Sequence, residues 1–294
     1  MNGIIVVNKP QKFTSFDVVA VMRGCFHTKK IGHSGTLDPM ATGVLPIFIG
    51  GATKAISVLP DCDKSYRAGF RLGMTSDTLD IWGECSKLHE VDISAEMLLE
   101  TLGKFRGDIE QIPPMYSALK VNGQKLCDLA RKGIEVERKP RKITISRLEL
   151  VRFDGTDGVI DVDCSSGTYI RSLVDDIGRA LGVGAVMTSL VRTRACGFSL
   201  SESYPLEELK TTPLEELERL LRPIESVFSD YPEICLDDNQ TRLYLNGVRL
   251  DAGRLRGVSG EGIYRVYGSG FIGIAKISAG ELISVKRFNG DKID

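Results

Sequence analysis

The sequence lacks paired cysteines and has few histidines. Its 294 residues include seven cysteines and three histidines, with no Cys-x-x-Cys pair and no Cys/His cluster. The cysteines lie singly, at positions 25, 62, 85, 127, 164, 196 and 235. An odd number of dispersed thiols argues against a disulfide framework, and the ligand spacing of a zinc site is missing. We therefore expect no metal, and cysteines that act as small buried hydrophobic residues in a reducing compartment.

Long apolar runs are also missing. No stretch of about 18 apolar residues occurs, so we expect no membrane-spanning helix. The start, "MNGIIVVNKP", lacks the basic, long apolar and small-residue pattern of a signal peptide. With 42% hydrophobic and 26% charged residues, the composition is typical of a soluble globular protein. These features predict a cytoplasmic protein with one large domain or a large domain and a small second one.

The net charge is close to zero, but the charges are segregated. The chain has 38 Lys/Arg and 39 Asp/Glu, for a formal charge of −1. Residues 120–142 contain eight Lys/Arg and three Asp/Glu, whereas residues 202–238 contain three and eleven. Such segregation can present one basic face to a nucleic acid. Either cluster can equally be an ordinary solvated surface.

Periodicity and turn residues outline the secondary structure. The expected elements are a strand over 3–10, a helix over 14–26, a buried strand over 43–50, a strand starting at 64, a helix over 94–105, a short helix within 111–145, a strand, turn and helix over 158–182, and helix over 205–221. We expect a boundary at 229–234. Beyond it, short strands between Gly-rich turns predict a small all-β unit.

The loop "GHSGTLDPMATGVLPIFIG", residues 32–50, carries a single acid, Asp38, before a buried strand. It matches neither the dinucleotide-binding nor the P-loop pattern, and "GHSG" is not a nucleophile elbow. His33 is close in sequence, but no serine is placed for a triad, and no second carboxylate for a glycosidase can be located. Asp38 before Pro39 can also simply shape a turn. On this loop alone, turn and catalyst remain equally open.

Five segments in order widen the pattern. They are the loop just quoted, "DKSYRAGFRLGMTSDTLDIWGE" at 63–84, "QIPPMYSALKVNGQKL" at 111–126, "CSSGTYIRSLVDDIGRALG" at 164–182 and "GAVMTSLVRTRACGF" at 184–198. Together they closely resemble the bacterial tRNA pseudouridine-55 synthase family of TruB type, from about Gly3 to Phe198. The resemblance implies an α/β (α+β) fold with a mixed, largely antiparallel central sheet flanked by helices. It also implies a C-terminal unit like the PUA RNA-binding fold.

The resemblance assigns three catalytic residues. Asp38 maps to the family's catalytic acid, and whether it attacks the base, attacks C1′ or removes the 2′ proton stays open. Arg171 maps to the arginine that pairs with this acid, and a guanidinium opposes the tendency of a desolvated carboxylate to bind a proton. Tyr66 maps to the aromatic residue that stacks on the target uracil and helps take the C5 proton. The alternatives are a surface arginine and a tyrosine packed in the core.

Four further residues are expected around the substrate. His33 maps to the residue that fills the space vacated by the flipped base, and Tyr169 and Leu190 to the pocket lining. Lys9, in the N-terminal Lys-Pro motif, is expected beside the active loop, more as support than as a chemical participant. A loop histidine bonded to backbone and plain core residues are the simpler alternatives.

The resemblance also sets the expected partners and domains. The isomerisation imports no group and changes no oxidation state, so no cofactor is expected. Residues 1–231 would form the catalytic domain, with an RNA-clamping insertion at about 113–145 that carries the basic cluster. Residues 232–294 would form the PUA-like domain. The expected partner is the T stem-loop of tRNA, and also its acceptor end, bound by a monomer.

Three positions depart from the family pattern. Asn8 stands where an Asp usually precedes Lys-Pro, Lys12 where a Gly usually follows, and Cys127 where an aromatic residue is common in the insertion. These departures affect the expected packing of the N-terminal loop and the grip on RNA.

Two other functions are compatible with parts of the sequence. One is an RNA-binding protein that assists tRNA folding, with chemistry secondary or lost. The other is a hydrolase that uses Asp38 on a nucleoside or glycoside, although no partner acid is recognisable. Substitution of Asp38 separates an enzyme from a binding protein, because only an enzyme loses turnover.

Overall fold

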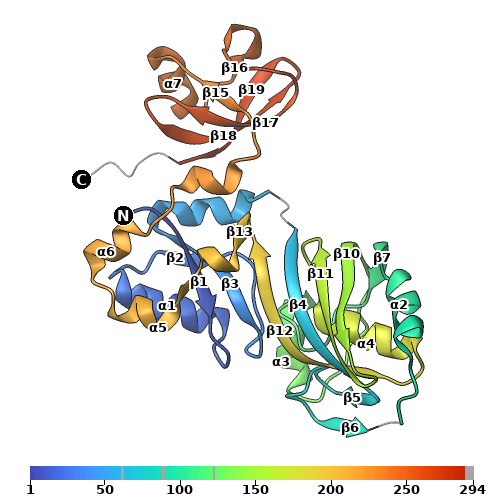
Figure 1. The fold of residues 1–294 in the computed structure, drawn as a ribbon. Coiled ribbons are helices and arrows are strands. Elements are labelled where there is room, and N and C mark those ends of the chain that lie inside the picture. The colour runs from blue at the N-terminus through green and yellow to red at the C-terminus, as the bar shows by residue number, and fades with distance from the viewer. Residues whose placement is uncertain (61–62, 88–89, 122, 289–294) are drawn as a thin grey trace.

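The larger part of the molecule is built on one long mixed sheet (Figure 1). The computed structural model describes residues 1–60, 63–87, 90–121 and 123–288. Eight strands run in the order β14-β1-β3-β12-β4-β11-β10-β7, with β2 paired to β3 and β13 to β12. Only the pairs β1–β14 and β3–β12 are parallel in this described sheet. The expected mixed, largely antiparallel sheet is confirmed.

The strands of this sheet are β1 Gly3–Lys9, β2 Ile31–His33, β3 Thr42–Ile49, β4 Lys64–Leu72, β7 Gly107–Gln111, β10 Arg141–Phe153, β11 Asp157–Cys164, β12 Ala185–Ala195, β13 Phe198–Ser199 and β14 Tyr204–Pro205. The helices packed around it are α1 Ser15–Cys25, α2 Ala95–Gly103, α4 Ile170–Ala180, α5 Leu206–Thr211, α6 Leu214–Arg219, and the 3₁₀ helices η1 Gly50–Val58, η2 Leu200–Glu202 and η3 Ile224–Phe228.

Strand β1 is apolar on both faces because each face meets a different layer. Ile5 and Val7 pack with α1, α5 and α6, whereas Ile4 and Val6 pack with η1 and η3 on the other side. A strand buried on both faces reads as a continuous apolar run rather than an alternating one. The run "GIIVV" therefore follows from its place inside the sheet.

At the other half of the sheet, α2 and α4 cover one face of β4, β10, β11 and β12. In each half of the sheet, one of the packed helices begins at a side chain that caps its N-terminus. Thr14 forms a capping box with Asp17 at the start of α1, and Ser94 accepts a hydrogen bond from the backbone N–H of Met97 at the start of α2. These caps start the helices that the sequence analysis expected over 14–26 and 94–105.

The C-terminal β domain is a separate five-stranded sheet in the order β15-β17-β18-β19-β16. Its elements are β15 Glu233–Cys235, α7 Asp238–Leu245, β16 Leu250–Asp251, η4 Ala252–Arg254, β17 Gly262–Tyr267, β18 Phe271–Ser278 and β19 Glu281–Arg287. Phe228 of η3 stacks on the ring of Phe271 and makes a tilted contact with that of Phe288, which joins this domain to the larger part of the molecule. The first strand of this domain, β15, begins at Glu233, within the boundary expected at 229–234.

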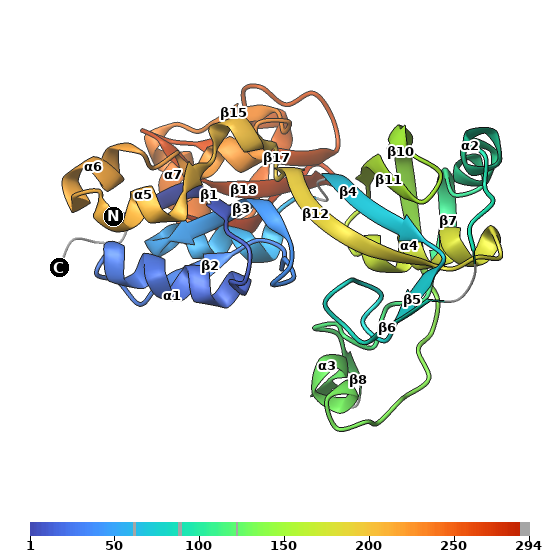
Figure 2. The same ribbon diagram turned by 60° about the horizontal axis from the view of Figure 1, so that its bottom comes forward.

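Two small hairpins project from the sheet next to each other (Figure 2). One consists of β5 Met74–Ser76 and β6 Cys85–Lys87. The other lies in the insertion and consists of β8 Lys120–Val121 and β9 Gln124–Lys125, followed by the short helix α3 Leu126–Ala130. Both approach the loop that carries Asp38, so the insertion forms part of the site.

Six cysteines lie in the described ranges and carry free thiols, while Cys62 falls outside them. No helix in the described part of the chain has the length and apolarity needed to cross a membrane.

Candidate active site

Asp38 lies in the loop between β2 and β3, which is held by backbone contacts on both sides. Its carbonyl accepts a hydrogen bond from the N–H of Ala41 at 3.0 Å, closing a turn. The hydroxyl of Ser15, at the start of α1, accepts a bond from the N–H of Leu37 at 2.8 Å. The Asp38 side chain is 35% exposed and points away from this turn towards Arg171. The backbone of Asp38 therefore shapes the turn while its carboxylate stays available for chemistry.

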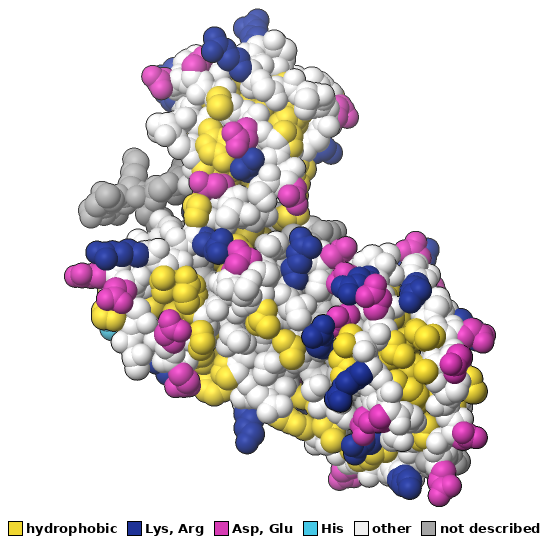
Figure 3. Space-filling model, in the orientation of Figure 1, with side chains coloured by type: hydrophobic (Ala, Val, Ile, Leu, Met, Phe, Trp, Pro, Cys, Tyr) yellow, Lys and Arg dark blue, Asp and Glu magenta, His cyan; other side chains and the backbone are white. Residues whose placement is uncertain are grey.

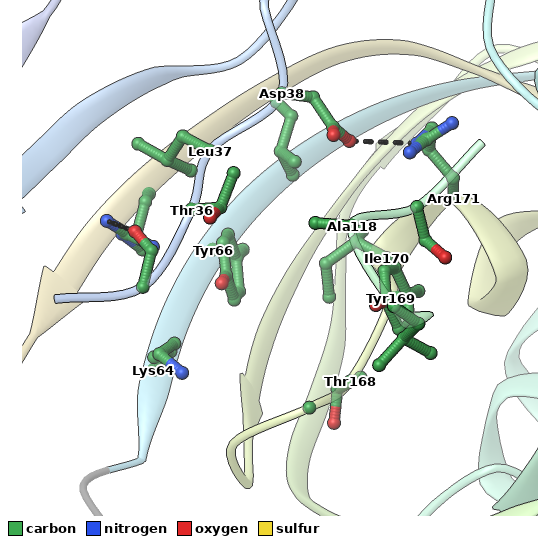
Figure 4. Close-up of a pocket in the computed structure, with 16 residues that line it drawn as sticks. Thr36, Leu37, Asp38, Lys64, Tyr66, Ala118, Thr168, Tyr169, Ile170 and Arg171 are labelled. Atoms are coloured by element: carbon green, nitrogen blue, oxygen red, sulfur yellow. Dashed lines mark hydrogen bonds and ion pairs between the residues drawn. The ribbon is translucent and has the colours of Figure 1, made fainter. Parts of the chain in front are cut away.

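Arg171, near the start of α4, connects Asp38 to two other segments. Its Nε lies 2.9 Å from Oδ2 of Asp38, as the dashed line in Figure 4 shows. Its Nη1 donates to the carbonyl of Thr78 and its Nη2 to that of Tyr116, both at 2.8 Å. The residue is only 4% exposed. Because the guanidinium is planar and has several donors, one side chain fixes the acid loop, the β5–β6 loop and the insertion together.

A cavity of about 320 Å³ opens beside this ion pair. Tyr66 of β4 lies in its wall, next to the loop of Leu37 and Asp38 in Figure 4. Burial raises the pKa of the Tyr66 phenol, and the nearby Arg192 guanidinium opposes that rise. The cavity volume lies at the lower end of the range for small-molecule sites, which suits a single nucleoside.

Tyr169 and Leu190 also line the cavity, so the structure brings five of the seven expected residues together. Tyr169 is the N-cap residue of α4. Gln111 lies at the end of β7. Its Oε1 accepts a hydrogen bond from the N–H of Tyr169 at 2.8 Å, and its Nε2 donates one to the carbonyl of Tyr169 at 3.1 Å. This pair of bonds fixes the start of α4, and with it the position of Arg171.

His33 and Lys9 are not among the residues that line the cavity. His33 ends β2, and burial lowers the pKa of its imidazole, so the ring is neutral at pH 7. Its Nδ1 is buried and has no hydrogen-bond partner among the residues that the structure describes. Lys9 is fully buried, and its Nζ donates to the carbonyls of Pro10 at 2.9 Å and Phe13 at 2.6 Å. Lys9 thus has the supporting position expected beside the active loop.

The buried ammonium of Lys9 should make stability depend on pH. Desolvation lowers the pKa of Lys9 from 10.5 to about 8, with Asp38 opposing the shift. Between these values the unfolded chain binds more protons than the folded one, so this group adds stability as the pH rises from 8 to 10.5. We expect a gain of at most about 3 kcal/mol.

The measurement is urea unfolding of the wild type and of Lys9→Met across this pH range. The wild type should gain stability relative to the variant as the pH rises. Comparison with the variant is needed because burial raises the pKa values of Cys164 and Tyr66, which removes stability at high pH in both proteins. Lys29→Met, at an exposed lysine, should run parallel to the wild type. Parallel curves for Lys9→Met would contradict the prediction.

The structure also reveals residues that the sequence analysis did not single out. Arg192 of β12 is fully buried, donates from Nε to the carbonyl of Val44 at 2.7 Å and from Nη2 to that of Gly35 at 3.1 Å, and lines the cavity. Residues i and i+2 of a strand lie on the same face of the sheet. The expectation that Leu190 lines the pocket therefore also pointed to Arg192, two residues further along the strand. Arg192 holds the start of the acid loop against β3.

A second acid lies near the ion pair, although none was recognisable in the sequence. Oδ2 of Asp80 is 3.8 Å from Nη1 of Arg171, on the β5–β6 loop. Its other oxygen accepts hydrogen bonds from Thr78 Oγ1 at 2.9 Å and from the N–H of Trp82 at 3.0 Å. Asp80 is 6% exposed and does not line the cavity that contains Tyr66. It therefore organises its loop rather than facing that cavity.

Comparison with known proteins decides the family. Residues 23–170 match the model of the TruB family pseudouridylate synthase N-terminal domain. Residues 171–229 match that of the tRNA pseudouridylate synthase B C-terminal domain. The chain belongs to the TruB family of pseudouridylate synthases. The resemblance seen in the sequence is confirmed, and the chain is an isomerase.

Relatives support the TruB assignment over nearly the whole length. A protein of Francisella tularensis subsp. tularensis, named tRNA pseudouridine synthase B, is 45% identical over 295 residues, covering 99% of this chain and 96% of the relative. One of Clostridium tetani with the same name is 44% identical over 279 residues, covering 94% and 96%.

A solved structure extends the comparison to the fold. A chain in the crystal structure of a Cbf5-Nop10-Gar1 complex has a TM-score of 0.76 and 25% identity, covering 97% of this chain and 84% of that one. The TruB assignment and the fold therefore agree.

Proposed function

We propose that this enzyme converts the T-loop uridine at position 55 of tRNA into pseudouridine, using the carboxylate of Asp38. The observation that carries the proposal is the ion pair of Asp38 with the buried Arg171 at the edge of a nucleoside-sized cavity walled by Tyr66. The named relatives support tRNA as the substrate.

The chemistry requires one reactive carboxylate and no imported group. The bond between N1 and C1′ breaks, the uracil turns, and C5 bonds to C1′. C5 then loses its proton and N1 gains one, so atoms and electrons balance within the nucleotide. A carboxylate can serve as the group that reacts at the nucleotide. Arg171 holds the Asp38 carboxylate in place through their ion pair, in which Nε lies 2.9 Å from Oδ2.

The remaining residues of the wall position the base. In this proposal Tyr66 stacks on the uracil, and Leu190 and Tyr169 close the cavity around it. Extracting the uridine from its loop costs a few kcal/mol, which stacking partly offsets. His33 would occupy the space that the flipped base leaves. Its ring is neutral at pH 7, which is compatible with a place among stacked bases.

The basic insertion is the proposed clamp on the T stem-loop. Its residues 117–119 line the cavity, and the exposed lysines and arginines that follow provide phosphate contacts. By contrast, Figure 3 shows Lys and Arg over β4 interspersed with acidic side chains, where Arg67 and Arg71 pair with Asp161 and Asp157 at 2.8 Å. The charges over β4 are thus largely paired, whereas residues 120–142 of the insertion carry five more positive than negative side chains.

The proposal includes the second domain and the setting. Residues 232–294 would be a PUA-like domain that contacts the acceptor end, and the enzyme would act as a monomer in the cytoplasm. Free, dispersed thiols are typical of that reducing compartment.

The direct test is tritium release from tRNA that carries 5-³H-uridine, with the modified position mapped. Pseudouridine formation removes the C5 hydrogen, so release that maps to the T-loop uridine supports the proposal. Tight tRNA binding without release would instead support a protein that only assists tRNA folding. Release from another position would overturn the assignment to position 55.

Tyr66→Phe separates stacking from proton transfer. The ring is kept, so binding of tRNA should change less than about threefold, since no apolar contact is lost. Turnover should fall by about 10²-fold or more if the hydroxyl helps move the C5 proton. Burial raises the pKa of Tyr66, so the hydroxyl is protonated at neutral pH and would accept a proton only while passing its own on.

Single-turnover rates and binding are measured for Tyr66→Phe and for a control, Tyr204→Phe. Tyr204 lies on β14 and is not a lining residue of the cavity. Wild-type turnover by Tyr66→Phe would restrict the residue to stacking.

A further inference from the structure

The only tryptophan in the sequence, Trp82, is exposed next to the active site. Its side chain lies in the loop between β5 and β6, and the residue is 48% exposed. Trp82 does not line the cavity that contains Tyr66, so the proposed chemistry leaves it without a role. A large aromatic side chain exposed beside a functional cavity commonly marks a binding surface.

The loop that carries Trp82 is rigid. The N–H of Trp82 donates to Asp80 Oδ1 at 3.0 Å, and the N–H of the preceding Ile81 donates to the carbonyl of Met187 at 2.9 Å. In return, the N–H of Met187 donates to the carbonyl of Leu79 at 3.1 Å. Arg171 binds the same loop through the carbonyl of Thr78. The backbone at Trp82 is therefore already ordered, which lowers the entropic cost of binding to it.

A second cavity of about 320 Å³ lies between Trp82 and the insertion. Asp38 and Arg171 line both cavities, so the two adjoin at the ion pair. Met40 and Tyr116 give the second cavity apolar walls, and Arg131 lies at its insertion side. The loop between β5 and β6 and the helix α3 both contribute lining residues, and Figure 2 shows these segments near each other.

The charges of this cavity suit a nucleotide. Its two acids, Asp38 and Asp80, both face Arg171. The Arg131 side chain is 72% exposed, and its Nη1 is 3.6 Å from Oδ1 of Asp128. An exposed ion pair of this kind contributes little to stability. Its guanidinium can reach a phosphate, while the indole offers a flat face to a base. Single-stranded nucleotides are recognised by this combination of aromatic stacking and a nearby cation.

The geometry points to Trp82 as a stacking platform for a nucleotide that directly flanks the target uridine in the RNA loop. The shared wall requires the two nucleotides to be close along the strand. Trp82 is then a residue that binds and selects the substrate, and it takes no part in bond breaking. This inference rests on the proposed function, because it takes the nucleotide in the first cavity to be the uridine that reacts.

Because Trp82 is the only tryptophan, its fluorescence reports on this site alone. The probe is full-length Asp38→Asn protein titrated with T stem-loop RNA, with binding followed independently by the anisotropy of labelled RNA. Stacking should quench the indole emission in step with binding. RNA with an abasic site at the flanking nucleotide should bind without quenching. Unchanged emission at saturation, with every RNA, would overturn the inference.

A double-mutant cycle provides the energetic test. Trp82→Ala should weaken binding of intact RNA by roughly 5- to 150-fold, the range found for one stacked base, and Trp82→Phe should recover most of it. For the abasic RNA, Trp82→Ala should cost nothing further, because the two partners no longer meet. Ile81→Ala, at the adjacent exposed residue, is the matched control and should leave binding unchanged.

The cycle distinguishes the inference from the function on which it rests. If wild-type protein fails to release tritium from intact tRNA, the proposed function fails regardless of Trp82. If it releases tritium, but removing a base at any position in the loop leaves the effect of Trp82→Ala on binding unchanged, only the stacking platform is excluded.

Discussion

Asp38→Asn should lower single-turnover pseudouridine formation by at least about 10⁴-fold, as loss of a catalytic group that acts directly in the reaction does. Asparagine is nearly isosteric, and the turn is closed by the backbone carbonyl of residue 38 and the N–H of Ala41, so the loop should persist. The side-chain oxygen can still accept a bond from Arg171. Binding of tRNA should therefore stay within about threefold of the wild type, since none of the phosphate contacts is removed.

The control is Asp92→Asn, which removes an exposed acid outside the cavity. It should be indistinguishable from the wild type in rate and binding. Asp38→Asn turnover within tenfold of the wild type would contradict the assignment of the reactive carboxylate. Loss of binding together with turnover would mean that Asp38 is mainly structural.

Arg171→Met should destabilise the protein as well as inactivate it. The substitution leaves the carboxylates of Asp38 and Asp80 without their cation and the carbonyls of Thr78 and Tyr116 without a donor. Breaking a buried charge pair by removing one partner typically costs about 3–5 kcal/mol. Urea unfolding measures this cost, provided that the dependence on denaturant stays the same.

Arg171→Lys keeps the charge and tests positioning separately from folding. An ammonium cannot reproduce the planar geometry that reaches three segments at once, so activity should fall by about 10²-fold or more through misplacement of the acid. Its loss of stability should be smaller than that of Arg171→Met. Arg152→Met, at an exposed arginine on β10, is the control and should change neither quantity appreciably. A fully active Arg171→Lys would show that charge alone is required.

Local signals in the sequence were sufficient for much of the fold. The strand expected over 3–10 and the helices expected over 14–26 and 94–105 are present in the structure as β1, α1 and α2. These signals act over a few residues, through helix caps and alternation, and so can be read in one dimension. The order of strands could not be derived in this way, since β3 pairs with β12 across about 150 residues of chain. The family resemblance implied only a mixed, largely antiparallel sheet, and the structure supplied its order.

The site divides in the same way. The loop sequence by itself left a turn and a catalyst equally open at Asp38, and the five motifs determined the family and the candidates Tyr66 and Arg171. Only the tertiary structure placed Arg192, Asp80 and Trp82 around the ion pair. The physical reason is that their contacts are with carbonyls, charges and cavities formed by distant segments. Whether a guanidinium is buried or an indole is exposed depends on how those segments pack together.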